Sequence, residues 1–223
     1  MLNIDNFLNF MKKRIKKIYF LYMLINIIFL VVNIIQSNFK LHVIITELGK
    51  LFLSAFFLQT LTVKFWDIYN SPAWFISCIF WLYLITPFFL HLFYLKRKTS
   101  FFILLSFLYY IVLAGEMIIL YYLSSKNVIN YDVCKIIIYS TPYMRAFYYL
   151  IGMNLGYIVI NLNDKIKSST LTEVISVIMM LSVYLSCIHI EKRTYIIYLV
   201  YIPVISLCLL TFGKYGGGRY RDF

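Results

Sequence analysis

The stretch TPYMRAFYYLIGMNLGYIVIN, Thr141–Asn161, decides the fold of this protein. It is a continuous apolar run of the length that a membrane helix needs, and it opens with Pro142, because proline is well tolerated in the first turn of a helix. Its one full charge, Arg145, either reaches the lipid headgroups or faces a partner inside a helix bundle. Gly152 and Gly156 form a G-x-x-x-G step, which lets another helix approach closely. The stretch therefore predicts a packed membrane helix with one candidate functional charge.

The composition of the whole chain extends this interpretation. Of its 223 residues, 62% are hydrophobic and 20% are aromatic, more than a soluble core can bury. Only helices and closed barrels satisfy their backbone in lipid, and the apolar runs are continuous rather than alternating, which favours helices. We expect an all-α fold, a polytopic transmembrane helix bundle, and a single integral membrane domain over residues 1–223.

The basic residues decide the predicted topology. The segment Leu41–Val63 is interrupted by Glu47 and Lys50. If this segment does not cross the membrane, most lysines and arginines in the flanking loops lie on the same side of the membrane as the N-terminus. The positive-inside rule then predicts a cytoplasmic N-terminus and about six crossings plus one re-entrant or interfacial helix. The expected crossings are Ile18–Ile35, Ala73–Leu95, Phe101–Leu123, Thr141–Asn161, Thr170–Ile190 and Thr194–Phe212.

The distribution of charge argues against nucleic-acid binding, and the spacing of the histidines and cysteines argues against a metal site. The net charge of +12 lies in short loops, where it contacts anionic lipid, so the expected partner is the bilayer and not nucleic acid. His42, His91 and His189 have no ligand-like spacing, and the four cysteines form no C-x-x-C pair. We therefore expect no metal site.

Charges inside apolar runs are the first candidates for function. Besides Arg145 these include Glu116, which follows Gly115 in the middle of a predicted span. A Glu116–Arg145 pair between consecutive helices is one interpretation, and a separate role for each is the other. Glu47 and Lys50 are three residues apart on one helix face, where they can neutralise each other.

Three separated motifs together resemble acyltransferase family 3, the bacterial membrane O-acyltransferases of surface polysaccharides. The first is KRIKKIYFLYML, Lys13–Leu24, and the second is SPAWFISCIFWLYLITPFF, Ser71–Phe89, in which Trp74 and Tyr83 match the family pattern. The third is RAFYYLIGMNLG, which starts at Arg145 and includes Gly152. The resemblance covers residues 12–213 and leaves 214–223 as a short polar tail.

The resemblance implies transfer of an acyl group, often acetyl, from acyl-CoA as co-substrate to a hydroxyl of a surface glycan, without another cofactor. Arg14, Lys17 and Lys13 would meet the phosphates of the CoA donor, although an anchor with a basic cytoplasmic flank explains the same charges. Arg145, Trp74, Tyr83, Gly152 and Glu116 are the remaining candidate functional residues. The implied location is the bacterial cytoplasmic membrane.

The family pattern also includes two earlier spans that carry its characteristic arginine and histidine, and this sequence departs from it there. We therefore expect a fragment, a frameshifted product or a degenerate member of the family, truncated or inactive, with an unknown catalytic base, because none of His42, His91 and His189 matches the family histidine. The alternatives are a non-catalytic component of polysaccharide export, polymerisation or transport, and a structural membrane protein.

Overall fold

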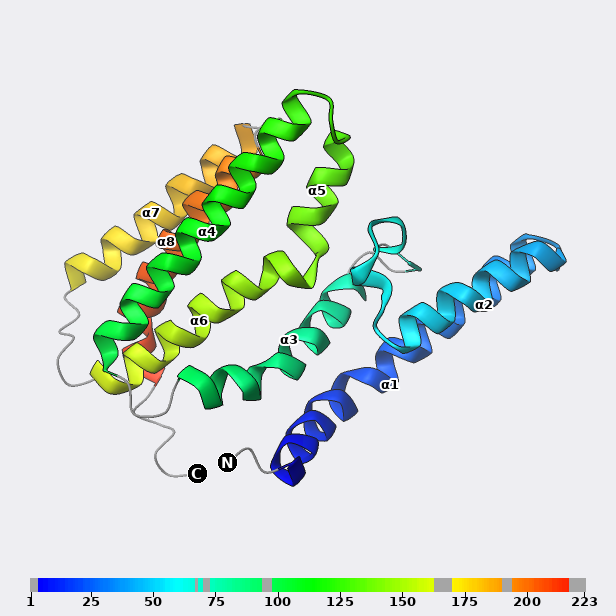
Figure 1. Ribbon diagram of the computed structural model, residues 1–223, viewed down its shortest axis with the longest axis horizontal. Coiled ribbons are helices and arrows are strands. Elements are labelled where there is room, and N and C mark those ends of the chain that lie inside the picture. Colours follow the sequence, from blue (N-terminus) through cyan, green and yellow to red (C-terminus); the bar gives the residue numbers. More distant parts are fainter. Residues whose placement is uncertain are drawn as a thin grey trace. The chain divides into compact units, whose positions relative to one another are not determined.

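The computed structural model of the protein describes residues 4–66, 68–69, 73–93, 98–162, 170–189 and 194–216. The regular structure within these ranges is helical and contains no strand, which confirms the all-α prediction. The helices in chain order (Figure 1) are α1 Ile4–Gln36, α2 Leu41–Ala55, the short 3₁₀ helices η1 Gln59–Leu61 and η2 Val63–Phe65, α3 Ala73–Phe93, α4 Thr99–Ser125, α5 Tyr131–Ser140, α6 Pro142–Leu162, α7 Thr170–His189 and α8 Thr194–Gly216.

Three helical segments of the described chain are long and apolar enough to cross a membrane: Phe7–Gln36, Ala73–His91 and Thr99–Ser125. Two shorter apolar segments, Leu171–Leu185 and Leu199–Phe212, lie in α7 and α8. The predicted number of about six crossings is therefore not confirmed. The opening stretch is a helix that begins at Pro142, as its sequence predicts, but it is not among the three crossing candidates.

The chain divides into two compact units. The first comprises Met1–Lys96 and Ile136–Arg145, and the second comprises Arg97–Lys135 and Ala146–Phe223. The prediction of one integral membrane domain over residues 1–223 stays a prediction.

In the first unit, α2 runs antiparallel beside α1 (Figure 1). The Glu47 carboxylate accepts a hydrogen bond from Asn33 near the end of α1, and the Tyr22 hydroxyl donates to the Ser54 carbonyl near the end of α2. The 15 residues of α2 span about 22 Å, less than the ~30 Å of a hydrocarbon core. The re-entrant or interfacial placement of residues 41–63 stays a prediction.

The core of the first unit is aromatic, and Phe57 lies at its centre. The Phe57 ring stacks on Tyr22 of α1 at 5.4 Å between centroids and on Phe80 of α3 at 4.4 Å. Aromatic pairs of this kind add about 0.5–1.5 kcal/mol to the area that they bury. Phe57 therefore joins the end of α2 to both long helices of this unit.

Phe57 makes these ring contacts from a left-handed backbone conformation. The chain after α2 forms a Schellman-type end, with Leu58 N bonded to Leu53 O at 2.8 Å and Phe57 N bonded to Ser54 O at 3.0 Å. Phe57 has φ 57°, at a position where glycine is usual because a side chain is strained there. Its carbonyl accepts hydrogen bonds from the Trp81 indole, at 2.9 Å, and from the Ser77 hydroxyl. These contacts, together with the stacked ring, offset the strain of about 1–2 kcal/mol.

The second unit is held by polar and aromatic contacts between its helices. Asn154 of α6 donates to the Ser106 hydroxyl of α4 at 3.1 Å, and the Tyr110 hydroxyl of α4 donates to the Leu199 carbonyl of α8. Helices α7 and α8 lie side by side (Figure 1). In a largely apolar bundle, such hydrogen bonds determine which helix faces meet.

Candidate functional site

A pocket of about 200 Å³ lies between α1 and α3 in the first unit. We name it the α1–α3 pocket. Its walls are almost entirely apolar. The two polar side chains on its lining besides Tyr22 are Lys17 and Asn26, which lie nine residues apart on α1. The lining residues are Lys17, Ile18, Leu21, Tyr22, Ile25 and Asn26 of α1, with Ala73 and Ile76 of α3.

Asn26 is the unusual group of this pocket. Its side chain is 1% exposed, and although it lies near the Tyr22 hydroxyl, neither its Nδ2 nor its Oδ1 completes a hydrogen bond within the described residues. The Tyr22 hydroxyl instead donates a hydrogen bond to the Ser54 carbonyl, at 3.1 Å. A buried amide without partners costs roughly 1–3 kcal/mol. Asn26 therefore offers one donor group and one acceptor to a ligand of the pocket.

The α1–α3 pocket continues toward the basic end of α1. A second hollow of about 20 Å³ shares Ile18 and Ile76 with it and is lined by Arg14 and Tyr83. The Arg14 guanidinium lies 5.6 Å from the centroids of both the Tyr83 ring and the Phe10 ring. This cation–π contact holds an exposed positive charge beside the second hollow.

A second cluster surrounds Arg145 in the same unit. The guanidinium lies 5.3 Å from the Tyr139 ring centroid and 5.5 Å from that of Trp74, and the Arg145 Nε donates to the Tyr139 carbonyl at 2.8 Å. The Tyr139 ring also contacts Trp66 edge to face. The break at Thr141 separates α5 from α6, and the Arg145 side chain in the first turn of α6 reaches Tyr139 near the end of α5. We name these four residues the Arg145 cluster.

The two sites meet at the first turn of α3. Ala73 lines the α1–α3 pocket beside Tyr22, and the ring of the next residue, Trp74, packs at a tilt against Tyr139 in the Arg145 cluster. Positive charge beside an apolar pocket and an arginine held by aromatic rings thus belong to one unit. The apolar pocket suits an apolar group, and the neighbouring cations suit an anionic one.

The comparison with protein families identifies the chain. The family model of the acyltransferase domain, acyltransferase family 3, matches residues 2–219. The chain belongs to acyltransferase family 3. Comparisons with curated proteins and with solved structures return no match.

In this member of acyltransferase family 3 the predicted donor-binding residues are only partly brought together. Arg14 and Lys17 line the two adjoining hollows between α1 and α3. Lys13 is exposed and lines neither of them. The motif residue Tyr83 lies against Arg14, and Trp74 lies against Arg145. The first two family motifs therefore meet at the pocket, a juxtaposition that no single motif reveals.

Two of the predictions concern residues of α6: the G-x-x-x-G step and a pair between Arg145 and Glu116. Within the described residues a Cβ added at Gly152 or Gly156 would meet no atom within 4 Å, so a close helix approach at the G-x-x-x-G step stays a prediction. Glu116 is half-buried in α4, in the second unit, whereas Arg145 belongs to the first. A Glu116–Arg145 pair stays a prediction.

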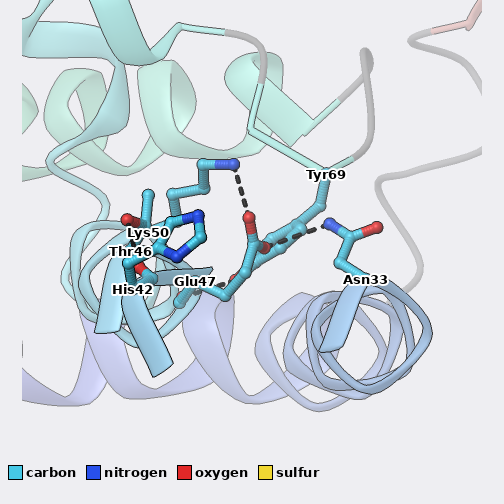
Figure 2. A network of polar contacts seen from close by, with 6 residues as sticks. All are labelled: Asn33, His42, Thr46, Glu47, Lys50 and Tyr69. Carbon is cyan, nitrogen blue, oxygen red and sulfur yellow. Dashed lines mark hydrogen bonds and ion pairs between the residues drawn. The ribbon is translucent and has the colours of Figure 1, made fainter. Parts of the chain in front are cut away.

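The predicted neutralisation of Glu47 by Lys50 is confirmed, and the pair is part of a larger network. Figure 2 shows the Glu47 carboxylate between Lys50, whose Nζ lies at 2.6 Å, and the Asn33 amide, at 3.0 Å. The Tyr69 hydroxyl donates to the Glu47 carbonyl at 2.7 Å. Burial alone would raise the pKa of Glu47, but the hydrogen bonds from Lys50 and Asn33 outweigh it and lower the pKa. Burial and the neighbouring Glu47 charge raise the pKa of Tyr69.

Sequence reasoning missed Asn26, Tyr139 and Trp66. A polar residue in the middle of the apolar run Ile18–Ile35 was a usable signal for Asn26, because polar side chains in membrane segments are often functional. Tyr139 and Trp66 had no such signal, since aromatic residues at the ends of spans are common in any membrane protein.

Proposed function

We propose that this protein transfers an acyl group, acetyl in the first instance, from acyl-CoA to a hydroxyl of a surface polysaccharide. Membership of acyltransferase family 3 over residues 2–219 carries the proposal. The α1–α3 pocket supports it, because cations beside an apolar pocket suit a donor with phosphates at one end and a thioester arm at the other.

The roles of these cations follow from their charge. Arg14 and Lys17 bind the donor phosphates, the arginine through its planar fork and the lysine as a point charge. From Lys17 to Asn26 the pocket follows α1 for nine residues, about 14 Å at the rise of an α-helix. The arm of the donor lies along this length and presents its acyl end near Asn26.

The Arg145 cluster lies on the acceptor side of this arrangement. The rings of Trp74 and Tyr139 restrict the guanidinium to one orientation, so its donors are directed before the acceptor arrives. Tyr139 is 37% exposed and offers an aromatic face beside them. Arg145 therefore positions a glycan oxygen relative to the acyl group.

The proposal is tested by the O-acetyl content of the surface polysaccharide in a bacterial strain that lacks the protein. We expect the content to fall and to be restored by the wild-type chain, but not by the Arg14→Gln/Lys17→Gln variant. The matched control is Lys12→Gln/Lys16→Gln, which removes the same charge from α1 at positions outside both hollows and should restore acetylation. An unchanged O-acetyl content in the deletion strain would overturn the proposed function.

A further inference from the structure

Tyr69 has a backbone conformation that is unusual for a bulky residue. Its φ is 59°, in the left-handed region, where the side chain crowds the following carbonyl oxygen. Strain of this kind persists only where neighbouring contacts stabilise it, and it is frequent at functional sites. Here the Tyr69 hydroxyl donates a hydrogen bond to the Glu47 carbonyl at 2.7 Å, and the preceding residue, Ile68, is buried. The chain is therefore held at this point against its local preference.

The Tyr69 hydroxyl connects the segment after η2 to α2, and through α2 to α1. Figure 2 shows the Tyr69 side chain reaching Glu47, whose carboxylate accepts a hydrogen bond from Asn33 of α1. The partner of Tyr69 is the main-chain carbonyl of Glu47, which lies inside α2. The contact therefore fixes the segment to the backbone of a helix and not to a side chain that can change rotamer.

Trp66, three residues before Tyr69, belongs to the Arg145 cluster. It directly follows η2, and its ring meets the Tyr139 ring edge to face, at 6.4 Å between centroids. Tyr139 in turn holds Arg145, whose guanidinium lies 5.3 Å from the ring centroid. The Cα atoms of Trp66 and Tyr69 are at most about 11 Å apart, the reach of three extended residues. A shift of Tyr69 therefore reaches Trp66 through a short length of chain.

We propose that Tyr69 is a positioning residue for the acceptor: its bond to α2 holds Trp66 against Tyr139, and this packing fixes the Arg145 cluster for the glycan. Trp74 packs against Tyr139 from α3, so that contact does not depend on Tyr69. Tyr69 acts through Trp66 and not on the reacting atoms. This inference rests on the proposed function and adds to it a residue that acts from outside the Arg145 cluster.

The first measurement follows the tryptophans directly. The chain has three, Trp66, Trp74 and Trp81, and incorporated fluorotryptophan gives their fluorine NMR signals in the full chain in lipid nanodiscs, assigned by Trp→Phe variants. Tyr69→Phe loses the hydroxyl but keeps the ring, and we expect it to shift the Trp66 signal. The Trp81 signal should not move, because its indole donates to the Phe57 carbonyl.

The matched control is Tyr110→Phe. It also removes a tyrosine hydroxyl that donates to a backbone carbonyl, that of Leu199, but it does so in the second unit. We expect this variant to leave the Trp66 signal where it is in the wild type. A shift in Tyr69→Phe alone would then result from the position of the lost hydrogen bond and not from the loss of a hydroxyl as such.

The second measurement separates the acceptor from the donor. It follows acetyl transfer from acetyl-CoA to de-O-acetylated surface polysaccharide purified from the deletion strain. In Tyr69→Phe we expect the KM for the polysaccharide to rise about two- to tenfold, the effect of losing one hydrogen bond, and the KM for acetyl-CoA to stay unchanged. A merely structural role would raise both, because Arg14 and Lys17 lie in the same unit. Tyr110→Phe should change neither.

A second variant tests the same connection from its other end. Trp66→Leu keeps the Tyr69 hydroxyl and removes the ring that meets Tyr139, so it should raise the polysaccharide KM by a similar factor. An unmoved Trp66 signal in Tyr69→Phe, an unchanged polysaccharide KM in either variant, or equal rises in both KM values would overturn the inference and leave the proposed function standing. If the folded wild-type chain transfers no acetyl group, the proposed function fails, and the inference fails with it.

Discussion

Removing the cation of the Glu47 network should destabilise the first unit by leaving a buried charge. In Lys50→Met the Glu47 carboxylate, whose side chain is 5% exposed, loses the ammonium at 2.6 Å and keeps only the Asn33 amide at 3.0 Å. A hydrogen bond to a charged group contributes about 1.5–3 kcal/mol. Lys50 is 31% exposed, so water can replace part of its interaction. We therefore expect the free energy of unfolding to fall by about 1–2 kcal/mol.

The measurement is reversible unfolding in mixed micelles, followed by circular dichroism. The double variant Glu47→Gln/Lys50→Met separates charge from packing, because its glutamine still accepts the hydrogen bond from Asn33 but carries no charge to desolvate. It should be more stable than Lys50→Met alone. A single variant as stable as the wild type, or a double variant less stable than the single, would refute the assignment of this energy to the ion pair.

Three further predictions concern pH, the Phe57 carbonyl and Arg145. Because the folded-state pKa of Glu47 lies below its unfolded value of 4.5, the network contributes stability above that pH. This stability should be lost as pH falls from about 4.5 through the lower folded pKa, and the loss should be much smaller in an unfolding titration of Glu47→Gln. Trp81→Phe removes the indole donor at 2.9 Å from the Phe57 carbonyl and should lower the free energy of unfolding by about 1 kcal/mol; equal denaturation midpoints would contradict this. Arg145→Ala should abolish acyl transfer, and Arg145→Lys should retain little of it because a point charge does not replace a planar fork; full activity of the lysine variant in a transfer assay would disprove the role.

The helical elements were largely predictable from the sequence, because each is determined by local features. Pro142 marks the start of α6, and Glu47 and Lys50 mark the segment in which α2 ends early. The sequence does not separate helix α5, Tyr131–Ser140, from α6, since the apolar residues at the end of α5 continue into those of α6. The number of crossings also could not be obtained, because it depends on how helices sit in lipid and not on their apolarity alone.

The candidate site was less predictable, because it depends on contacts between distant residues. Helices that are apolar on all sides give no periodic signal for the face that meets a neighbour. The pairing of Arg14 with Tyr83 and the joint presence of Asn26 and Ala73 in one pocket are therefore visible only in three dimensions. Phe57 is a further case, since a bulky residue in the left-handed region contradicts local preference and is stabilised by contacts with α1 and α3.

The central claim is that the α1–α3 side of the first unit binds acyl-CoA, and binding of labelled acetyl-CoA to membranes that contain the protein tests it most directly. The account predicts saturable binding that is lost in Arg14→Gln/Lys17→Gln and retained in Lys12→Gln/Lys16→Gln, although both variants lose the same charge. Equal binding by the two variants, or no saturable binding by the wild-type chain, would contradict it.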